Sequence, residues 1–416
     1  MTFHGLEDVW RRESSHVLGA LLRRHGDYGD CEDAAQEALL AAVDQWPREG
    51  VPDNPRGWLI RVAWRRLVDR QRARVAREQR ELSDGRAERG DDPAALPGPG
   101  EHAPEDRDDS LRLLLMCCHQ SLSRPSQVAL TLRAVAGLSV EQIAAAYLVP
   151  PRTMTQRLTR ARAALRDAGA RFAMPTPDDL PARVAAVLDV CHLVFNEGYT
   201  RTSGDRLVDT DLAEEGLRLT RLLHAALPDH DEVTGALALM LLTHARTAAR
   251  TDEAGDLVPL RDQDRRQWDR AMVAEGVALL ERVLPRGHVG RYQLQAAIAA
   301  VHAEAPTWPD TDWPQIALLY AMLHDVAPGP AVTLNRAVAV AMARTPDDGL
   351  ALVDGLLDDP AMRRHHRTHA VRAHLLEMAG DPEAALPAYR EAARLTASQP
   401  EQRYLNAQAA RLGGEG

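Results

Sequence analysis

Residues 138–166 constrain the fold of this chain more than any other stretch, because they predict two short helices joined by a tight turn. Ser139 and Gln142 have the spacing of a capping box at the start of the first helix. Val149-Pro150-Pro151 ends that helix because proline lacks a backbone N–H, and Pro151 suits the first position of the next helix. The positions of the second helix that fall on one buried face are Met154, Leu158, Ala161 and Leu165.

The remaining positions of the second helix are basic or able to form hydrogen bonds. The candidate DNA contacts among them are Arg152, Thr153, Gln156, Arg157, Arg160 and Arg162. A short helix, a turn and a second helix with such a surface are typical of a helix-turn-helix, whose second helix enters the major groove of DNA. Taken alone, the segment is also compatible with a plain helical hairpin whose arginines are solvated.

A second basic helix is predicted upstream, over residues 56–80. It contains nine arginines against two acidic residues, a net charge of +7. Arginines interleaved with flat rings can hold phosphates and stack on unpaired bases, and Trp64 has arginines on both sides. Trp58, near the start of the helix, is at least as well explained as a core anchor. The candidate nucleic-acid contacts are Arg61, Trp64, Arg65, Arg66, Arg70, Arg72 and Arg74.

An acidic helix precedes the basic one and starts near Asp30. Acidic residues in its first turn suit the positive end of the helix dipole. Ala35, Leu39 and Ala42 are expected to be buried, which leaves an acidic outer face. That outer face consists of Asp33, Gln36 and Glu37. Considered alone, it is better explained as an ordinary solvated surface.

The composition predicts an all-α protein. Of the 416 residues, 45% are hydrophobic but only 4% are aromatic, and no alternating pattern typical of strands is present. Charge is distributed unevenly: residues 1–172 hold 26 arginines against 25 acidic residues, whereas residues 173–416 hold 24 against 35. The first part could approach a polyanion such as DNA, but the second, with a net charge of −11, is not suited to this.

Four segments follow from these patterns: residues 1–82, a flexible linker at 83–109, the helix-turn-helix segment at 110–172, and a C-terminal helical region at 173–416. In the last segment Ala337 and Ala373 lie thirty-six residues apart. Gly380, Ala385 and Tyr389 then follow Ala373 as in a tetratricopeptide helix pair, which indicates a partly tetratricopeptide-like (TPR-like) region.

The sequence also bears on location and chemistry. The four cysteines form no CxxC pair, and the sequence shows no apolar leader. The longest apolar run, Ala236–Leu242, is too short to span a bilayer. These features predict a reduced, soluble, cytoplasmic protein that does not cross a membrane. None of the common nucleotide-binding, zinc-protease or serine-hydrolase motifs is present. His365 and His369, Cys117-Cys118-His119 and Glu197 are better explained by structure than by chemistry, so we expect no enzyme activity, no metal and no cofactor.

Three motifs in order resemble the extracytoplasmic-function sigma factors of bacterial RNA polymerase. They are Asp30-Cys-Glu-Asp-Ala-Ala-Gln-Glu-Ala-Leu-Leu, Asn54-Pro-Arg-Gly-Trp-Leu-Ile-Arg-Val-Ala with Asp69-Arg70, and the helix-turn-helix. The C-terminal region resembles the helical extension of one subgroup, through Phe195-Asn-Glu-Gly-Tyr199, Gln263-Asp-Arg-Arg-Gln-Trp268, Tyr292-Gln-Leu-Gln-Ala-Ala-Ile-Ala-Ala and Asp310-Thr-Asp-Trp313. Leu148 departs from the glycine that is common in the turn of the helix-turn-helix, and Trp64-Arg65 replaces a frequent Arg-Asn.

The resemblance implies two sigma-factor domains, regions 2 and 4, a C-terminal regulatory region and a role in transcription initiation. Core RNA polymerase would bind the acidic outer face, and promoter DNA would bind the two basic helices. Arg157 and Gln156 would read bases of the −35 element, while Arg152, Arg160 and Arg162 would mainly hold phosphates. Residues 56–74 would open the −10 element, and the C-terminal region could take a peptide or protein ligand.

Two other functions remain open at this point. One is a helix-turn-helix regulator with a helical-repeat sensor domain, which would have no need of the acidic face formed by Asp33, Gln36 and Glu37. The other is a DNA-binding module fused to an enzyme in residues 180–416, which a bound metal or substrate would favour.

Overall fold

The computed structural model describes residues 3–82 and 103–414, and it confirms the predicted all-α class. Two compact units are present, Met1–Val190 and Cys191–Gly416, and each is described by itself. In the described part of the chain the β structure is limited to an isolated bridge and one pair of two-residue strands, β1 (Ser203–Gly204) and β2 (Ala397–Ser398).

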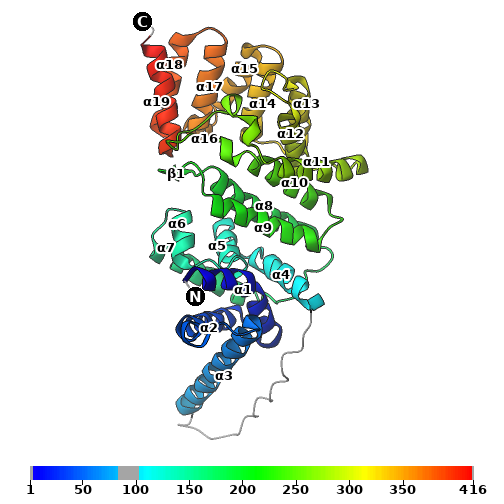
Figure 1. Cartoon of the computed structure of the whole chain (residues 1–416), viewed down its shortest axis with the longest axis vertical. Coiled ribbons are helices and arrows are strands. Elements are labelled where there is room, and N and C mark those ends of the chain that lie inside the picture. Colours follow the sequence, from blue (N-terminus) through cyan, green and yellow to red (C-terminus); the bar gives the residue numbers. More distant parts are fainter. Residues whose placement is uncertain (1–2, 83–102, 415–416) are drawn as a thin grey trace. The chain divides into compact units, whose positions relative to one another are not determined.

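The first unit begins with three helices that pack against one another: α1 (Phe3–His25), α2 (Tyr28–Glu49) and α3 (Pro55–Leu82) (Figure 1). Their common core includes Leu21, Ala38 and Leu59, all of which are buried. Trp58 of α3 meets Trp46 of α2 edge to face, with 5.4 Å between ring centroids. This contact supports the interpretation of Trp58 as a core anchor.

Four further helices complete most of this unit: α4 (Ala103–Cys117), α5 (Arg124–Ala134), α6 (Val140–Ala146) and α7 (Pro151–Asp167). The capping box is confirmed, since the Ser139 hydroxyl accepts from the Gln142 N–H and the Gln142 side chain accepts from the Ser139 N–H. The predicted buried face of α7 is confirmed as well, at Met154, Leu158, Ala161 and Leu165.

The turn between α6 and α7 places Leu148 in a left-handed conformation with φ of 49°. Leu148 is the only non-glycine residue with a positive φ among the residues that the structure describes. Leu148, which stands where glycine is common in such turns, therefore occupies a position at which glycine would be least strained.

The predicted linker at 83–109 is too long at its C-terminal end, because helix α4 already starts at Ala103. The sequence itself is compatible with a helix here, because Pro104 and the acidic residues after it suit a first helical turn. Asp109 is buried and pairs with Arg23 of α1 and with Arg112. The rest of the predicted linker, residues 83–102, lies outside the described residues.

The predicted boundary at 172/173 also differs from the structure, in which the first unit extends to Val190, inside helix α8 (Leu180–Tyr199). The Arg183 guanidinium donates to the Leu115 carbonyl at 3.0 Å. Arg124 binds Asp189 at 2.6 Å and the Ala186 carbonyl at 3.0 Å. These bonds attach the first half of α8 to α4 and α5.

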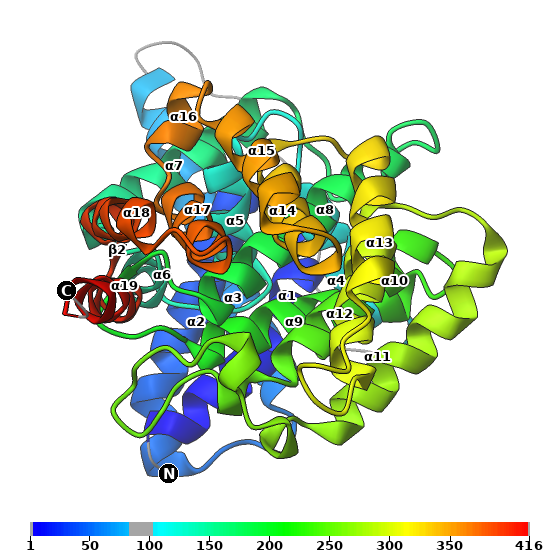
Figure 2. The ribbon, with the colours of Figure 1, turned by 90° about the horizontal axis from the view of Figure 1, so that it is seen from above.

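The second unit is a succession of helices, each in contact with the next along most of the chain (Figures 1 and 2). They are α9 (Thr210–Ala226), α10 (Asp231–His244), α11 (Arg270–Val283), α12 (Arg291–Glu304), α13 (Trp313–Val326), α14 (Pro330–Ala343), α15 (Pro346–Leu356), α16 (Pro360–Arg363), α17 (His366–Met378), α18 (Pro382–Leu395) and α19 (Gln399–Gly413). Short 3-10 helices lie at Thr247–Ala249, Leu260–Asp262, Arg265–Gln267 and Leu284–Arg286.

Small residues set the close helix crossings of this unit, as the TPR-like pattern predicts. Ala337 and Ala373 are fully buried, and a Cβ on Gly349 would lie 2.6 Å from the Ala337 carbonyl oxygen. Gly380 turns the chain between α17 and α18 with φ of 82°. Gly198 of the Phe195–Tyr199 motif allows α9 to approach α8, since a Cβ there would lie 2.2 Å from the Ala213 nitrogen.

Candidate nucleic-acid interface

The recognition-helix candidate α7 presents a row of polar side chains. Arg152, Thr153, Gln156 and Arg160 are exposed and Arg157 is half-buried. Among the described residues, Arg152, Arg157 and Arg160 form no ion pair. Since α7 is anchored by its buried face, these donors have a rigid support from which to meet bases or phosphates.

Helix α3 presents a second row. Arg61, Arg65 and Arg72 are exposed and have no ion-pair partner within the described part of the chain. Trp64 is half-buried, and the Arg24 guanidinium lies 5.6 Å from the centroid of its ring. The side chains of α3 beyond Ala76 are outside the described set, so the described row ends there.

The acidic outer face of α2 lies against arginines of the candidate DNA-binding set. Glu37 pairs with Arg70 and lies 3.9 Å from Arg66, measured from carboxylate oxygen to guanidinium nitrogen. Asp33 lies 3.6 Å from Arg70 and 3.1 Å from Arg162. Gln36, the third member of the face, is half-buried. Two of the three predicted polymerase contacts therefore already hold arginines predicted to bind DNA.

Glu32 is the central residue of this arrangement, and the sequence analysis missed it. Its side chain is 3% exposed, and it binds Arg133 of α5 at 3.0 Å and Arg162 of α7 at 2.9 Å. Burial, and then the charge of Glu32, raise the pKa of the neighbouring Tyr28 hydroxyl well above its usual value. The available signal was helical spacing, because Glu32 falls on the same face as Tyr28 and Ala35.

A carboxylate buried with two arginines ties α2 to α5 and α7 within the first unit. Removing one partner of such a group is costly, because the remaining charges lose their compensation in a medium of low dielectric constant. Arg162, one of the predicted phosphate contacts, is thus occupied by Glu32 and Asp33 in this arrangement. The other five DNA-contact candidates of α7, from Arg152 to Arg160, are not part of this cluster.

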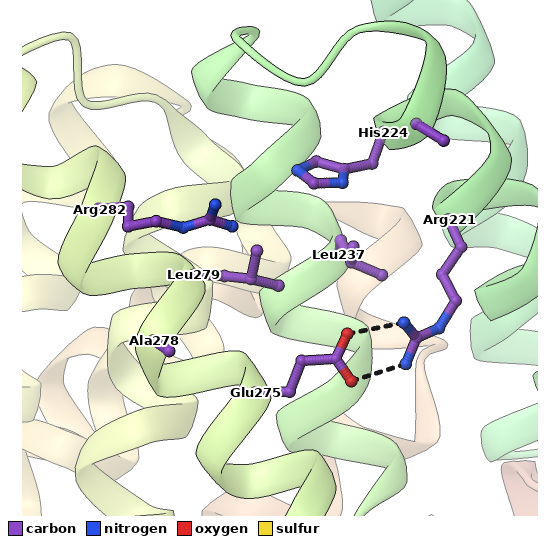
Figure 3. A pocket seen from close by; sticks show the side chains of 8 residues that line it. Arg221, His224, Leu237, Glu275, Ala278, Leu279 and Arg282 are labelled. Atoms are coloured by element: carbon purple, nitrogen blue, oxygen red, sulfur yellow. Dashed lines mark hydrogen bonds and ion pairs between the residues drawn. The ribbon is translucent and has the colours of Figure 1, made fainter.

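Helices α9, α10 and α11 of the second unit border a hollow of about 400 Å³ (Figure 3). Arg221 and Glu275 close one side through two hydrogen bonds of 2.6 and 2.8 Å. Burial, followed by the charges of Arg282 and Arg221, lowers the pKa of His224 there. The hollow lacks a nucleophile paired with a base, so it offers binding contacts and no evident catalytic arrangement.

Other residues considered for chemistry have structural surroundings. Glu197 accepts from the backbone N–H and the hydroxyl of Thr202 at 3.3 Å, and burial raises its pKa. All four cysteines are buried, and none of them forms a disulfide bond. Within the described residues, no cluster of three or more His, Cys, Asp or Glu side chains is arranged to hold a metal ion. No described helix is long and apolar enough to cross a bilayer.

Three family models match successive parts of the chain. Residues 9–77 match sigma-70 region 2, residues 112–165 match sigma-70 region 4, and residues 183–284 match a family of unknown function, DUF6596. The first match covers α2 and most of α3, and the second covers the helix-turn-helix. All the residues that border the hollow of Figure 3 lie within the third.

Two kinds of relatives are found among curated proteins. An uncharacterized protein of Rhizobium meliloti (strain 1021) is 41% identical over 402 residues, which cover 96% of this chain and 94% of the relative. A protein of Mycobacterium tuberculosis named "probable ECF RNA polymerase sigma factor SigI" is 30% identical over 158 residues, 37% of this chain and 52% of the relative. No solved structure gives a significant match.

Proposed function

This chain belongs to the extracytoplasmic-function family of RNA polymerase sigma factors and carries an added C-terminal region, and from this premise we propose which of its residues bind promoter DNA and polymerase. Sigma-factor families are not enzymes; their two domains interact with core RNA polymerase and promoter DNA. The observation that carries the residue assignment is a pair of arginine rows, one on α3 within region 2 and one on α7 within region 4, whose members Arg61, Arg65, Arg72, Arg152, Arg157 and Arg160 form no ion pair with a described residue.

Helix α7 would lie in the major groove of the −35 element. Arg157 and Gln156 would contact base edges, while Arg152 and Arg160 would hold phosphates. The half-buried position of Arg157 supports this division, because a side chain packed at its base loses less freedom when it makes a directed contact. Arg162 would join the phosphate contacts only after leaving Glu32 and Asp33.

Replacing Arg157 and Arg152 separately by alanine tests this assignment. A good bidentate base contact contributes about 1–3 kcal/mol of discrimination, so Arg157→Ala should relax sequence preference at one position. Arg152→Ala should weaken binding to all sequences alike and flatten the dependence of affinity on salt. The measurement is binding of polymerase holoenzyme to a panel of mutated promoters. Identical effects of the two variants would contradict the division of roles.

Helix α3 would open the −10 element. Arg61, Arg65 and Arg72 would follow the phosphates, and the half-buried ring of Trp64 would lie near the unpaired strand. Because Trp58 packs against Trp46, it would support the helix and not contact DNA. The expected difference is that Trp64→Ala reduces transcription from a duplex promoter more than from a pre-melted one.

Asp33, Gln36 and Glu37 of α2 would form the polymerase contact. Asp33 and Glu37 would then exchange Arg70 and Arg162 for basic groups of polymerase. Reversing both charges with Asp33→Arg and Glu37→Arg should weaken core binding in a titration. The matched control is Asp44→Arg, an exposed acidic residue of the same helix whose partner, Arg48, lies within that helix.

The C-terminal region would have a regulatory role, with a protein or peptide as its ligand. Support comes from its repeat-like helix pairs, since stacked pairs of this kind build surfaces for partners. Its net charge of −11 makes direct DNA contact unfavourable. Of the two regulatory modes, inhibition and positive requirement, we favour a region that is required for transcription.

A further inference from the structure

Helices α13, α14 and α15 border a hollow of about 460 Å³ on the second unit. Its floor and walls are largely apolar, with Leu318 and Ala321 from α13, Val340 from α14 and Leu352 from α15. The three helices pack through Ile316, Ala337 and Val353, all buried, so the hollow has a fixed frame. The hollow lies outside the segment that matches the family of unknown function.

An apolar stripe on α13 begins at Leu318, which borders this hollow, and continues along the helix. Leu318, Met322 and Val326 recur every four residues and are 63%, 41% and 52% exposed. A single large apolar side chain with this exposure is common on protein surfaces. Three such side chains on one helix face beside a hollow are typical of a surface that a partner covers.

The charge that borders the hollow is net positive, since Arg336 and Arg344 face one carboxylate, that of Asp348. Arg336 and Arg344, both bordering the hollow, form no ion pair with any described residue. The Nε of Arg336 is buried and has no hydrogen-bond partner, although buried donors are almost always satisfied. The acidic residue at this site, Asp348, accepts from the Thr345 hydroxyl at 3.0 Å and forms no ion pair with a described residue, so the three charged groups leave a net charge of +1 beside the hollow.

Building on the regulatory role proposed above for the C-terminal region, we propose that the surface formed by Leu318, Met322, Val326, Arg336 and Arg344 binds an acidic amphipathic helix of a protein partner. Carboxylates on that helix would satisfy the two arginines, and its apolar side chains would cover the stripe. The nine residues from Leu318 to Val326 span about 12 Å along α13, so the partner needs roughly two to three helical turns.

A helix fits this surface better than an extended strand. The hollow is bordered by helices, whose backbone groups are paired internally, so a strand would find no sheet edge to extend. A helix needs side-chain anchors at spacings of three and four, and the stripe on α13 supplies a matching repeat. Nucleic acid is disfavoured because phosphates and sugars would leave the exposed apolar stripe uncovered.

Selection of peptides from a random display library on the full-length protein tests this proposal. The expected result is enrichment of sequences with acidic residues and apolar residues three and four apart. Synthetic copies of enriched peptides should bind the wild-type chain at least tenfold more tightly than Leu318→Glu or the double variant Arg336→Ala with Arg344→Ala. Met378→Glu, on an exposed apolar residue of α17, is the matched control and should bind like wild type.

Three outcomes would overturn the proposal: no enrichment, enrichment of peptides without acidic residues, or binding that does not change in the Leu318→Glu variant. Self-association of the wild-type chain that Leu318→Glu abolishes, measured by sedimentation, would identify a second copy as the occupant instead. Circular dichroism of each variant checks that the fold is retained. Because peptide binding needs neither polymerase nor DNA, its failure is distinguishable from failure of the proposed sigma-factor contacts.

Discussion

Single residues hold the strained and charged positions of this protein, and Leu148 is the simplest case. A left-handed conformation costs an L-residue roughly 1–2 kcal/mol, and glycine avoids most of that cost. Leu148 is 52% exposed, so little packing is lost when its side chain is removed.

We therefore expect Leu148→Gly to raise the stability of the helix-turn-helix by about 0.5–1 kcal/mol, net of the extra freedom that glycine gains in the unfolded chain. Leu148→Val should do the opposite, because a β-branched residue tolerates positive φ poorly. The measurement is the thermal unfolding midpoint of the full chain. An unchanged midpoint in both variants would mean that the turn is relaxed.

The buried side chain of His302 should make the stability of the second unit depend on pH. Burial, reinforced by Arg246 and Arg265, lowers its pKa to about 4, and its ring stacks beside Trp308. The unfolded chain binds a proton near pH 6.5, well before the folded one does. Stability should therefore fall as the pH drops from about 6.5 to about 4 and change little above that window.

Replacing His302 with phenylalanine should remove up to about 3 kcal/mol of that acid dependence. The free energy of unfolding, measured by urea denaturation between pH 7 and pH 4, tests this expectation. His288→Phe, at a side chain that is 87% exposed, serves as control. An acid dependence equal to that of wild type in the His302 variant would contradict the assignment.

The sequence was a good guide to residues whose role depends on one helix alone. The buried face of α7 and the capping box at Ser139 follow from spacing within a few turns. Glu32 could not be assigned in this way, because its partners lie 101 and 130 residues away. Its position on an apolar face of α2 indicates that the carboxylate is buried and needs a partner. Only the packing of α2 against α5 and α7 shows which residues it binds.

At the scale of helices, the contact of α2 with α5 and α7 depends on Glu32. Glu32→Ala would leave Arg133 buried without a carboxylate and Arg162 with Asp33 alone, a loss of about 3–5 kcal/mol for broken pairs of this kind. We expect faster amide hydrogen exchange in α2 and α7 of the full-length variant. Asp44→Ala, which removes an exposed pair within α2, should leave exchange unchanged. Unaltered exchange in the Glu32 variant would show that apolar packing alone holds the helices.

Helix boundaries followed from the sequence where caps and prolines mark them, as at Pro151 and Pro55. Two boundaries did not. The start of α4 lies in a stretch whose composition is that of a linker, and the first unit extends past the predicted boundary into α8 because Arg183 and Asp189 bind the preceding helices. Both errors come from contacts between segments, which local composition does not report.

At the scale of the whole molecule, the contacts of α8 determine where a truncated chain can end without loss of stability. A chain ending at Val190 keeps the bonds from Arg124 to Asp189 and to the Ala186 carbonyl, whereas a chain ending at Asp179 loses them. We expect the longer truncation product to be more stable, by about 1–3 kcal/mol for the lost charge-assisted bonds. Thermal unfolding of the two products checks this.

The product ending at Val190 also tests the regulatory role of the C-terminal region. If that region is required for activity, this product should still bind promoter DNA with polymerase but transcribe less than the full chain. A constitutive gain of transcription would instead show that the region inhibits, and would overturn our preference. The shorter product is the control for loss of fold, since it lacks the same region and the α8 contacts.

The shared ion pairs of Asp33 have a thermodynamic consequence under the proposed contacts. Arg162 cannot hold a phosphate and Asp33 at once, and Asp33 cannot hold Arg162 and polymerase at once. When polymerase binds Asp33, Arg162 is released from Asp33 for DNA, and when DNA binds Arg162, Asp33 is released for polymerase. Polymerase and DNA should therefore bind with positive cooperativity even if they never touch. Linkage makes this coupling reciprocal: the factor by which polymerase raises affinity for DNA equals the factor by which DNA raises affinity for polymerase.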